Sequence, residues 1–190
     1  MAAMTASDVG ELTRRVQRVE DIEAVRRTWH DYMAFLDSRR WEELADVFTA
    51  DGAVEMIGLD TSRPGGGTSG TIRDGIYRGR RSIIDDFYNV GARSGQPVTR
   101  RPATGHFGNN LRVDFDGDEA LTSAYFWEIV PGGGENHTLL IGTYQHRMRR
   151  EPDRWRIKYL RITITMVGHL PWAGEFGAHT IGEVLSMPLP

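Results

Sequence analysis

The chain has 190 residues, no cysteine and a formal net charge of −3. This length predicts a single domain spanning residues 1–190, because a chain of this size can bury one large core. The lack of cysteine excludes disulfide bonds, thiolate zinc sites and cysteine nucleophiles. Acidic and basic residues are interspersed, without a basic stripe for nucleic acid or a polybasic membrane anchor. We therefore expect a small-molecule substrate as the partner, with no nucleic acid and no membrane.

Signals for membranes, secretion and common cofactors are missing. No stretch approaches the roughly 20 apolar residues of a membrane span, and the N-terminal residues lack the basic and apolar regions of a signal peptide. The glycine run at Gly65 is not followed by lysine and serine, and no two histidines have the helical spacing of metal ligands. We expect a cytoplasmic protein that uses no cofactor and no metal.

The N-terminal part of the chain predicts one long amphipathic helix over residues 6–37, with Ser7 as its N-cap. After a break at residues 38–40, the pattern predicts a short helix over residues 41–48 and a strand over residues 53–57. The apolar positions of the long helix recur every three to four residues: Leu12, Val16, Val19, Ile22, Val25, Trp29, Tyr32 and Leu36.

The middle of the chain is rich in glycine. Residues 59–75 predict a flexible surface loop, which is either a lid over a site or a tolerated insertion. A third helix is predicted over residues 79–92, with Ile83, Ile84, Phe87 and Val90 facing inward.

From about residue 105 the apolar residues alternate with polar ones, which predicts strands. The predicted strands cover residues 105–115, 120–130, 138–150 and 155–167, joined by short turns as an antiparallel meander. Residues 168–190 are apolar but irregular, so we expect this extension to pack on the sheet or on a neighbouring subunit. Helices followed by strands favour an α+β fold, with N-terminal helices packed on a curved antiparallel sheet that encloses a pocket.

Asp37 is the first candidate for a catalytic residue. It follows Leu36 at the predicted end of an amphipathic helix, with Phe35 and Trp41 on either side. Partial burial would make its carboxylate a better proton acceptor near neutral pH. The alternative is an ordinary aspartate that caps the next helix.

His106 is the second candidate. It begins a predicted strand between Gly105 and Gly108, which leave room for a ligand or another part of the chain to approach closely. Imidazole can donate or accept a proton near neutral pH. The alternative is a structural histidine bonded to a backbone carbonyl.

Two further residues are weighed against structural roles. Tyr32 precedes Asp37 by five residues and is either a site residue or core packing. Arg161 lies among apolar residues of a predicted central strand, where it must form an ion pair or bind a ligand. The other five histidines are predicted to face outward: His30, His137, His146, His169 and His179.

An ordered set of short motifs resembles the SnoaL-like branch of the nuclear-transport-factor-2-like superfamily, of the type that contains scytalone dehydratase and bile-acid 7α-dehydratase. The resemblance covers nearly the whole chain, from Val19 to Val167. The matching motifs are Asp21-Ile22-Glu23-Ala24-Val25, Tyr32-x4-Asp37, Trp41-Glu42-Glu43-Leu44, Tyr77-Arg78-Gly79, Thr104-Gly105-His106-Phe107-Gly108, Gly142-Thr143-Tyr144 and Trp155-Arg156-Ile157.

The resemblance implies a cone-shaped α+β barrel and an Asp-His pair in a deep pocket, formed here by Asp37 and His106. It also implies catalytic roles for Tyr32 and Arg161. Phe126 replaces a second histidine of scytalone dehydratase, and Met56 replaces a tyrosine of the dehydratases, so the substrates of those enzymes do not carry over. Alternation along the predicted elements indicates that six further residues face inward and line the pocket: Met33, Met56, Phe87, Phe126, Trp127 and Met166.

The resulting prediction is a cofactor-independent, dehydratase-like lyase that acts on a small cyclic hydroxylated metabolite. His106, oriented by Asp37, would remove an acidic proton from the substrate. One alternative is a polyketide or terpenoid cyclase or isomerase with the same pair, and another is a small-molecule-binding protein without catalysis. An exposed sheet face and an apolar extension suggest a homo-oligomer, either a trimer or a dimer.

Overall fold

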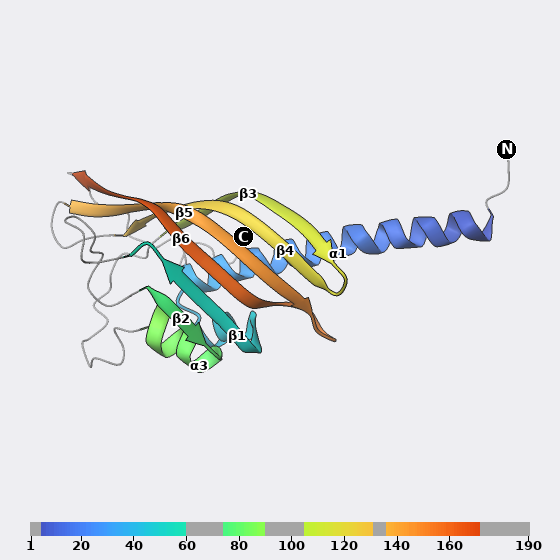
Figure 1. Ribbon diagram of the computed structural model, residues 1–190, viewed down its shortest axis with the longest axis horizontal. Coiled ribbons are helices and arrows are strands. Elements are labelled where there is room, and N and C mark those ends of the chain that lie inside the picture. Colours follow the sequence, from blue (N-terminus) through green and yellow to red (C-terminus); the bar gives the residue numbers. More distant parts are fainter. Residues whose placement is uncertain (1–4, 60–73, 90–104, 131–135, 172–190) are drawn as a thin grey trace, which may run out of the picture.

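The computed structural model describes residues 5–59, 74–89, 105–130 and 136–171 (Figure 1). In chain order its elements are α1 (Ala6–Asp37), α2 (Trp41–Asp46), β1 (Phe48–Ile57), β2 (Gly75–Arg78), α3 (Arg80–Ser82), the π-helical segment η1 (Ile83–Tyr88), β3 (Gly105–Asp116), β4 (Glu119–Val130), β5 (Asn136–Arg150) and β6 (Trp155–Pro171).

The strands form one curved, open sheet in the order β2-β1-β6-β5-β4-β3. Every neighbouring pair is antiparallel except β1 and β6, which run parallel. The sheet was predicted to be antiparallel, but it is mixed. Strand β6 pairs antiparallel with β5 on one side and parallel with β1 on the other. The register shifts within β3–β4 and β5–β6 interrupt the regular pairing, and interruptions of this kind bend a sheet. Figure 1 shows the C-terminal half of α1 lying against one face of this sheet.

The sequence pattern predicts the long strands well and the region around η1 less well. Strands β3 to β6 are confirmed, with β6 extending to Pro171 instead of ending at residue 167. Strand β2 was missed because it has only four residues. The predicted third helix is a short α-helical turn followed by η1, where the Asn89 N–H donates to the Ile84 carbonyl at 2.7 Å. The predictions for residues 60–73, for residues 90–92 with Val90, and for residues 172–190 lie outside the described residues.

Helix α1 begins and ends through local chemistry. Its N-cap is Thr5 rather than Ser7: the Thr5 hydroxyl accepts the Asp8 N–H, and the Asp8 carboxylate accepts the Thr5 N–H, which together form a capping box. At the other end Arg39 has a φ of 55°, so the chain leaves the helix directly after Ser38. Asp37 is therefore the last helical residue.

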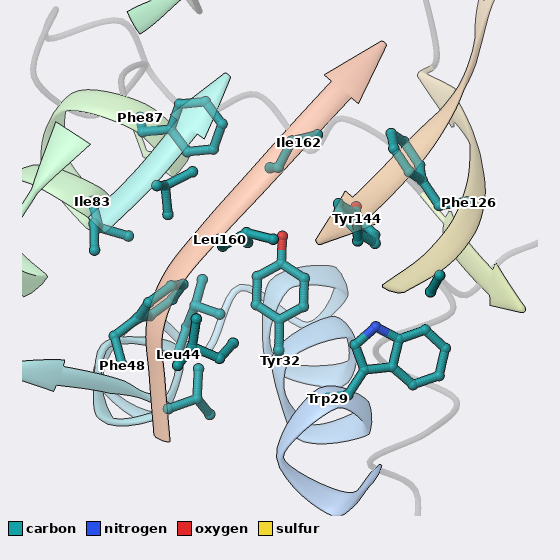
Figure 2. Packing of buried hydrophobic residues seen from close by; sticks show 14 of the residues in the cluster. Trp29, Tyr32, Leu44, Phe48, Ile83, Phe87, Phe126, Tyr144, Leu160 and Ile162 are labelled. Atoms are coloured by element: carbon teal, nitrogen blue, oxygen red, sulfur yellow. The ribbon is translucent and has the colours of Figure 1, made fainter. Parts of the chain in front are cut away.

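The core lies between the concave face of the sheet and the covering elements α1, α2 and η1. Figure 2 shows Tyr32 projecting from α1 toward the strands that carry Leu160 and Tyr144. The buried part of α1 begins only at Asp21 and includes Val25 and Trp29. No helix in the described residues is long and apolar enough to cross a membrane.

Gly108 determines how closely α1 approaches β3. A Cβ atom at Gly108 would lie 2.4 Å from Trp29 Cζ2 and 2.9 Å from Met33 Sδ. We expect Gly108→Ala to lower the free energy of unfolding by about 1–3 kcal/mol, because α1 must shift away from β3. Chemical denaturation measures this loss.

Gly168→Ala is the matched control for that substitution. A Cβ at Gly168 would meet Leu139 Cβ at 3.9 Å, an ordinary contact. If the two alanine variants unfold at the same denaturant concentration, the close packing of α1 on Gly108 does not limit stability.

Candidate active site

Asp37 joins the end of α1 to the beginning of β3. Its carboxylate accepts the backbone N–H of His106 at 3.2 Å and lies 2.6 Å from Nδ1 of the His106 ring. Helix α2 has Arg40 as its N-cap and no side-chain hydrogen bond there, so Asp37 does not cap the next helix. The carboxylate of Asp37 is therefore buried against His106, and the capping role considered for it is excluded.

The His106 ring lies between two carboxylates. Nδ1 faces Asp37, and Nε2 lies 3.3 Å from Oε2 of Glu128. The side chains of His106, Asp37 and Glu128 are only 8%, 5% and 13% exposed. Little water therefore screens their charges, and the three groups form one buried cluster.

Glu128 was missed by the sequence analysis, although one signal pointed to it. Position 128 continues the inward-facing series of β4, which includes the buried Ala124 and Phe126, so a glutamate there interrupts an apolar pattern. In the sheet His106 and Glu128 are direct partners across the β3–β4 ladder. The strand pattern alone does not establish this register.

The two carboxylates keep the His106 ring protonated. Burial alone would lower the pKa of His106, because a charged ring loses its hydration. The charges and hydrogen bonds of Glu128 and Asp37 outweigh that loss and raise the pKa to about 10. This differs from the sequence expectation of a neutral His106 that accepts a proton. At neutral pH the imidazolium can donate a proton, and a carboxylate is the group available to accept one.

Two buried tyrosines, Tyr32 and Tyr144, and the partly buried Tyr88 lie near this cluster. Tyr32 Oη lies 2.8 Å from Tyr88 Oη, and the Tyr32 and Tyr144 rings meet edge to face at 5.9 Å. Burial raises the pKa of each of these tyrosines, and the charge of Glu128 raises it further. All three hydroxyls therefore remain protonated and can act as hydrogen-bond donors at neutral pH.

His146 is buried, so the prediction that it faces outward is wrong. Its Nδ1 lies 2.8 Å from the Thr122 hydroxyl, and its ring packs against Tyr32 and Tyr144. Among the described residues its Nε2 has no hydrogen-bond partner. Burial lowers the pKa of His146 to about 3, so this ring is neutral near pH 7.

Three predicted site residues do not face this cluster. Arg161 is exposed on the outer face of the sheet and pairs with Glu55, so its role here is an ion pair, although not a buried one. Trp127 stacks on Phe107 on the same outer face, and Met166 is exposed. Adjacent strand residues point to opposite faces, so Phe126 and Trp127 cannot both point inward.

The other predicted lining residues lie on the inner side. Met56, Phe87 and Phe126 are buried in the core, and Met33 is packed against it. Across the ranges that the structure describes, no group of three or more His, Cys, Asp or Glu side chains could hold a metal ion.

Helix α1 packs against the concave face of an open, curved sheet. This arrangement is the α+β fold of the nuclear-transport-factor-2-like class. A family model described as the SnoaL-like domain matches residues 17–161. The chain therefore belongs to the SnoaL-like family. A search of the curated proteins finds no match.

Several solved structures share this fold. Hexachlorocyclohexane dehydrochlorinase LinA-type3 from Novosphingobium barchaimii LL02 is 19% identical with a TM-score of 0.64, and the match covers 87% of this chain and 99% of that chain. A provisionally assigned scytalone dehydratase from Novosphingobium aromaticivorans DSM 12444 is 22% identical with a TM-score of 0.59, covering 87% and 95%. A provisionally assigned aromatic ring hydroxylase from Novosphingobium aromaticivorans DSM is 22% identical with a TM-score of 0.59, covering 80% and 94%. At these identities the likeness shows the fold alone.

Proposed function

We propose that this chain is a cofactor-independent lyase that removes water from a small cyclic hydroxylated metabolite. The observation that carries the proposal is the burial of the His106 ring between Asp37 and Glu128 on the concave side of the sheet. A buried imidazolium beside a carboxylate supplies both a proton donor and a proton acceptor, which elimination of water requires.

In the proposed reaction the Glu128 carboxylate takes a proton from the carbon next to a substrate carbonyl. The electron pair of that C–H bond forms the new C=C bond as the C–O bond to the hydroxyl group breaks. His106 donates the Nε2 proton to the departing hydroxyl, which leaves as water. Asp37 holds the ring through Nδ1 and the backbone N–H, so that Nε2 keeps its direction.

The same two residues restore their charges after the product leaves. Glu128 is then a carboxylic acid and His106 is neutral, with Oε2 and Nε2 3.3 Å apart. Transfer of the proton from Glu128 to Nε2 regenerates the imidazolium and the carboxylate. No external acid, base or cofactor is consumed in this cycle.

Tyr32 is the proposed donor to the substrate carbonyl. Negative charge develops on that oxygen when the neighbouring C–H bond breaks, and a protonated hydroxyl in a buried site stabilises it. Tyr32 remains protonated because burial raises its pKa. Arg161, the other donor considered from the sequence, lies on the outer face with Glu55.

The names of two similar structures support an elimination reaction, since one is a dehydrochlorinase and the other is provisionally assigned as a dehydratase. The substrates in those names are not transferred to this chain.

A panel of cyclic β-hydroxy ketones in deuterated water tests the proposal by proton NMR. The expected result is formation of the unsaturated ketone with release of water. Exchange of the proton next to the carbonyl without loss of the hydroxyl would favour an isomerase or cyclase. Ligand binding with neither exchange nor elimination would favour the binding-protein alternative.

A further inference from the structure

The first half of α1 carries an apolar stripe that is separate from the candidate active site. We call the four residues Val9, Leu12, Val16 and Val19 the α1 stripe. They are 50%, 50%, 49% and 60% exposed, whereas Val25, Trp29 and Tyr32 in the second half of the helix are buried in the core. A row of four exposed apolar side chains on one helix typically marks an interaction surface.

The spacing of the stripe is that of a coiled coil. Its members follow one another at intervals of three, four and three residues, which places Val9 and Val16 at position a and Leu12 and Val19 at position d of a heptad. Valine at position a with leucine at position d, the combination of Val9 and Leu12, favours a two-stranded association. The spacing therefore suits another helix better than a flat sheet or a loop.

The location of the stripe leaves it accessible. Figure 1 shows the N-terminal half of α1 extending beyond the sheet, away from the body of the molecule. Residues 11–20 are all exposed, and the first buried residue of the helix is Asp21. Isolated helical segments of about 15 residues are marginal in water, so this one gains stability when its apolar stripe is covered.

We propose that the α1 stripe binds the same stripe of a second copy of this chain, with the two helices parallel and in register. Charge complementarity favours this partner. Arg15 occupies position g and Glu20 occupies position e of the next heptad, and these positions face each other across a parallel pair. A parallel dimer thus forms two Arg15–Glu20 pairs between the helices.

An antiparallel pair lacks this advantage. Position g then faces position g of the other helix, which brings Arg15 of one copy toward Arg15 of the other. The apolar layers also change, because Val16 faces Leu12 rather than Val16. The two arrangements are therefore distinguishable by which residues lie opposite each other.

Single cysteines provide the direct test, because the chain contains none. A disulfide requires Cα atoms within roughly 7 Å. In the full-length protein under mild oxidation, Val16→Cys is expected to form a covalent dimer. Arg14→Cys, at the solvent-facing position f, is the matched control and is expected to remain uncrosslinked. Equal crosslinking of both variants, or of neither, would overturn the proposal.

Sedimentation equilibrium adds a second measurement. Val16→Glu places two like charges against each other in the seam and is expected to weaken association at least about tenfold, whereas Arg14→Glu should leave it unchanged. Both residues are exposed in the single chain, so at a concentration where the chain is monomeric the thermal unfolding of the domain should stay the same. An unchanged association constant for Val16→Glu, or equal losses for both variants, would show that copies of the chain do not meet through this stripe.

Discussion

Replacing His106 by alanine is expected to lower turnover about 100- to 10,000-fold, the usual range for removal of a general acid or base. The imidazolium is the proposed proton donor to the departing hydroxyl, and no other described side chain bridges Asp37 and Glu128. The measurement is the initial rate of water elimination from whichever β-hydroxy ketone the wild-type protein converts.

His30→Ala is the matched control, because His30 is an exposed histidine on α1. It should leave the rate unchanged. Circular dichroism must show that the His106→Ala variant is folded, because removal of the imidazole ring leaves the carboxylates of Asp37 and Glu128 without their shared partner. A folded His106→Ala protein with the wild-type rate would exclude the proposed proton transfer.

Replacing Glu128 by glutamine is expected to have an effect on turnover of similar size, about 100-fold or more, because an amide cannot accept the substrate proton. The same change removes the negative charge beside Nε2, and that charge is the largest of the contributions that raise the pKa of His106. The NMR titration of the His106 ring should therefore move from about pH 10 to lower pH.

The pH dependence of stability should change in the same variant. The folded-state pKa of His106 is about 10 and the ordinary value is 6.5. Its contribution to stability is complete below pH 6.5 and is lost as the pH rises through about 10. With a lower folded-state pKa, Glu128→Gln should lose less unfolding free energy across this range.

Glu119→Gln is the control for both measurements. Glu119 lies at the opposite end of β4, where it pairs with Lys158 and Arg147. Its replacement should not alter the rate or the His106 titration. If Glu128→Gln behaves like Glu119→Gln, Glu128 is not the proton acceptor.

Much of the fold could be predicted because its signals are local. The three-to-four periodicity identified α1 over residues 6–37, and alternation identified β3 to β6. Alternation was less reliable for single side chains. It assigned inward positions to Trp127 and Met166, which lie outward. Trp127 has aromatic neighbours on both faces of β4, and a register shift between β5 and β6 at Ile141/Gly142 changes the alternation of β6 before Met166.

The candidate site was predictable only in part. The proximity of Asp37 and His106 was anticipated from the family resemblance, and the structure places the two in contact. Glu128 was not anticipated, because its partner His106 lies on another strand, and their pairing depends on the register of β3 against β4. The burial of His146 likewise depends on the packing of α1 against β5.

The sequence by itself determined the α+β order of elements, the ends of α1 and the coiled-coil spacing of the α1 stripe, since each depends on residues within a few positions of one another. The tertiary structure decided the parallel pairing of β1 with β6, the exposure of the stripe and the two carboxylates around His106. The physical reason is that burial and charge arise from neighbours distant in the chain. The pKa of one histidine therefore rises to about 10 and that of another falls to about 3 in the same domain.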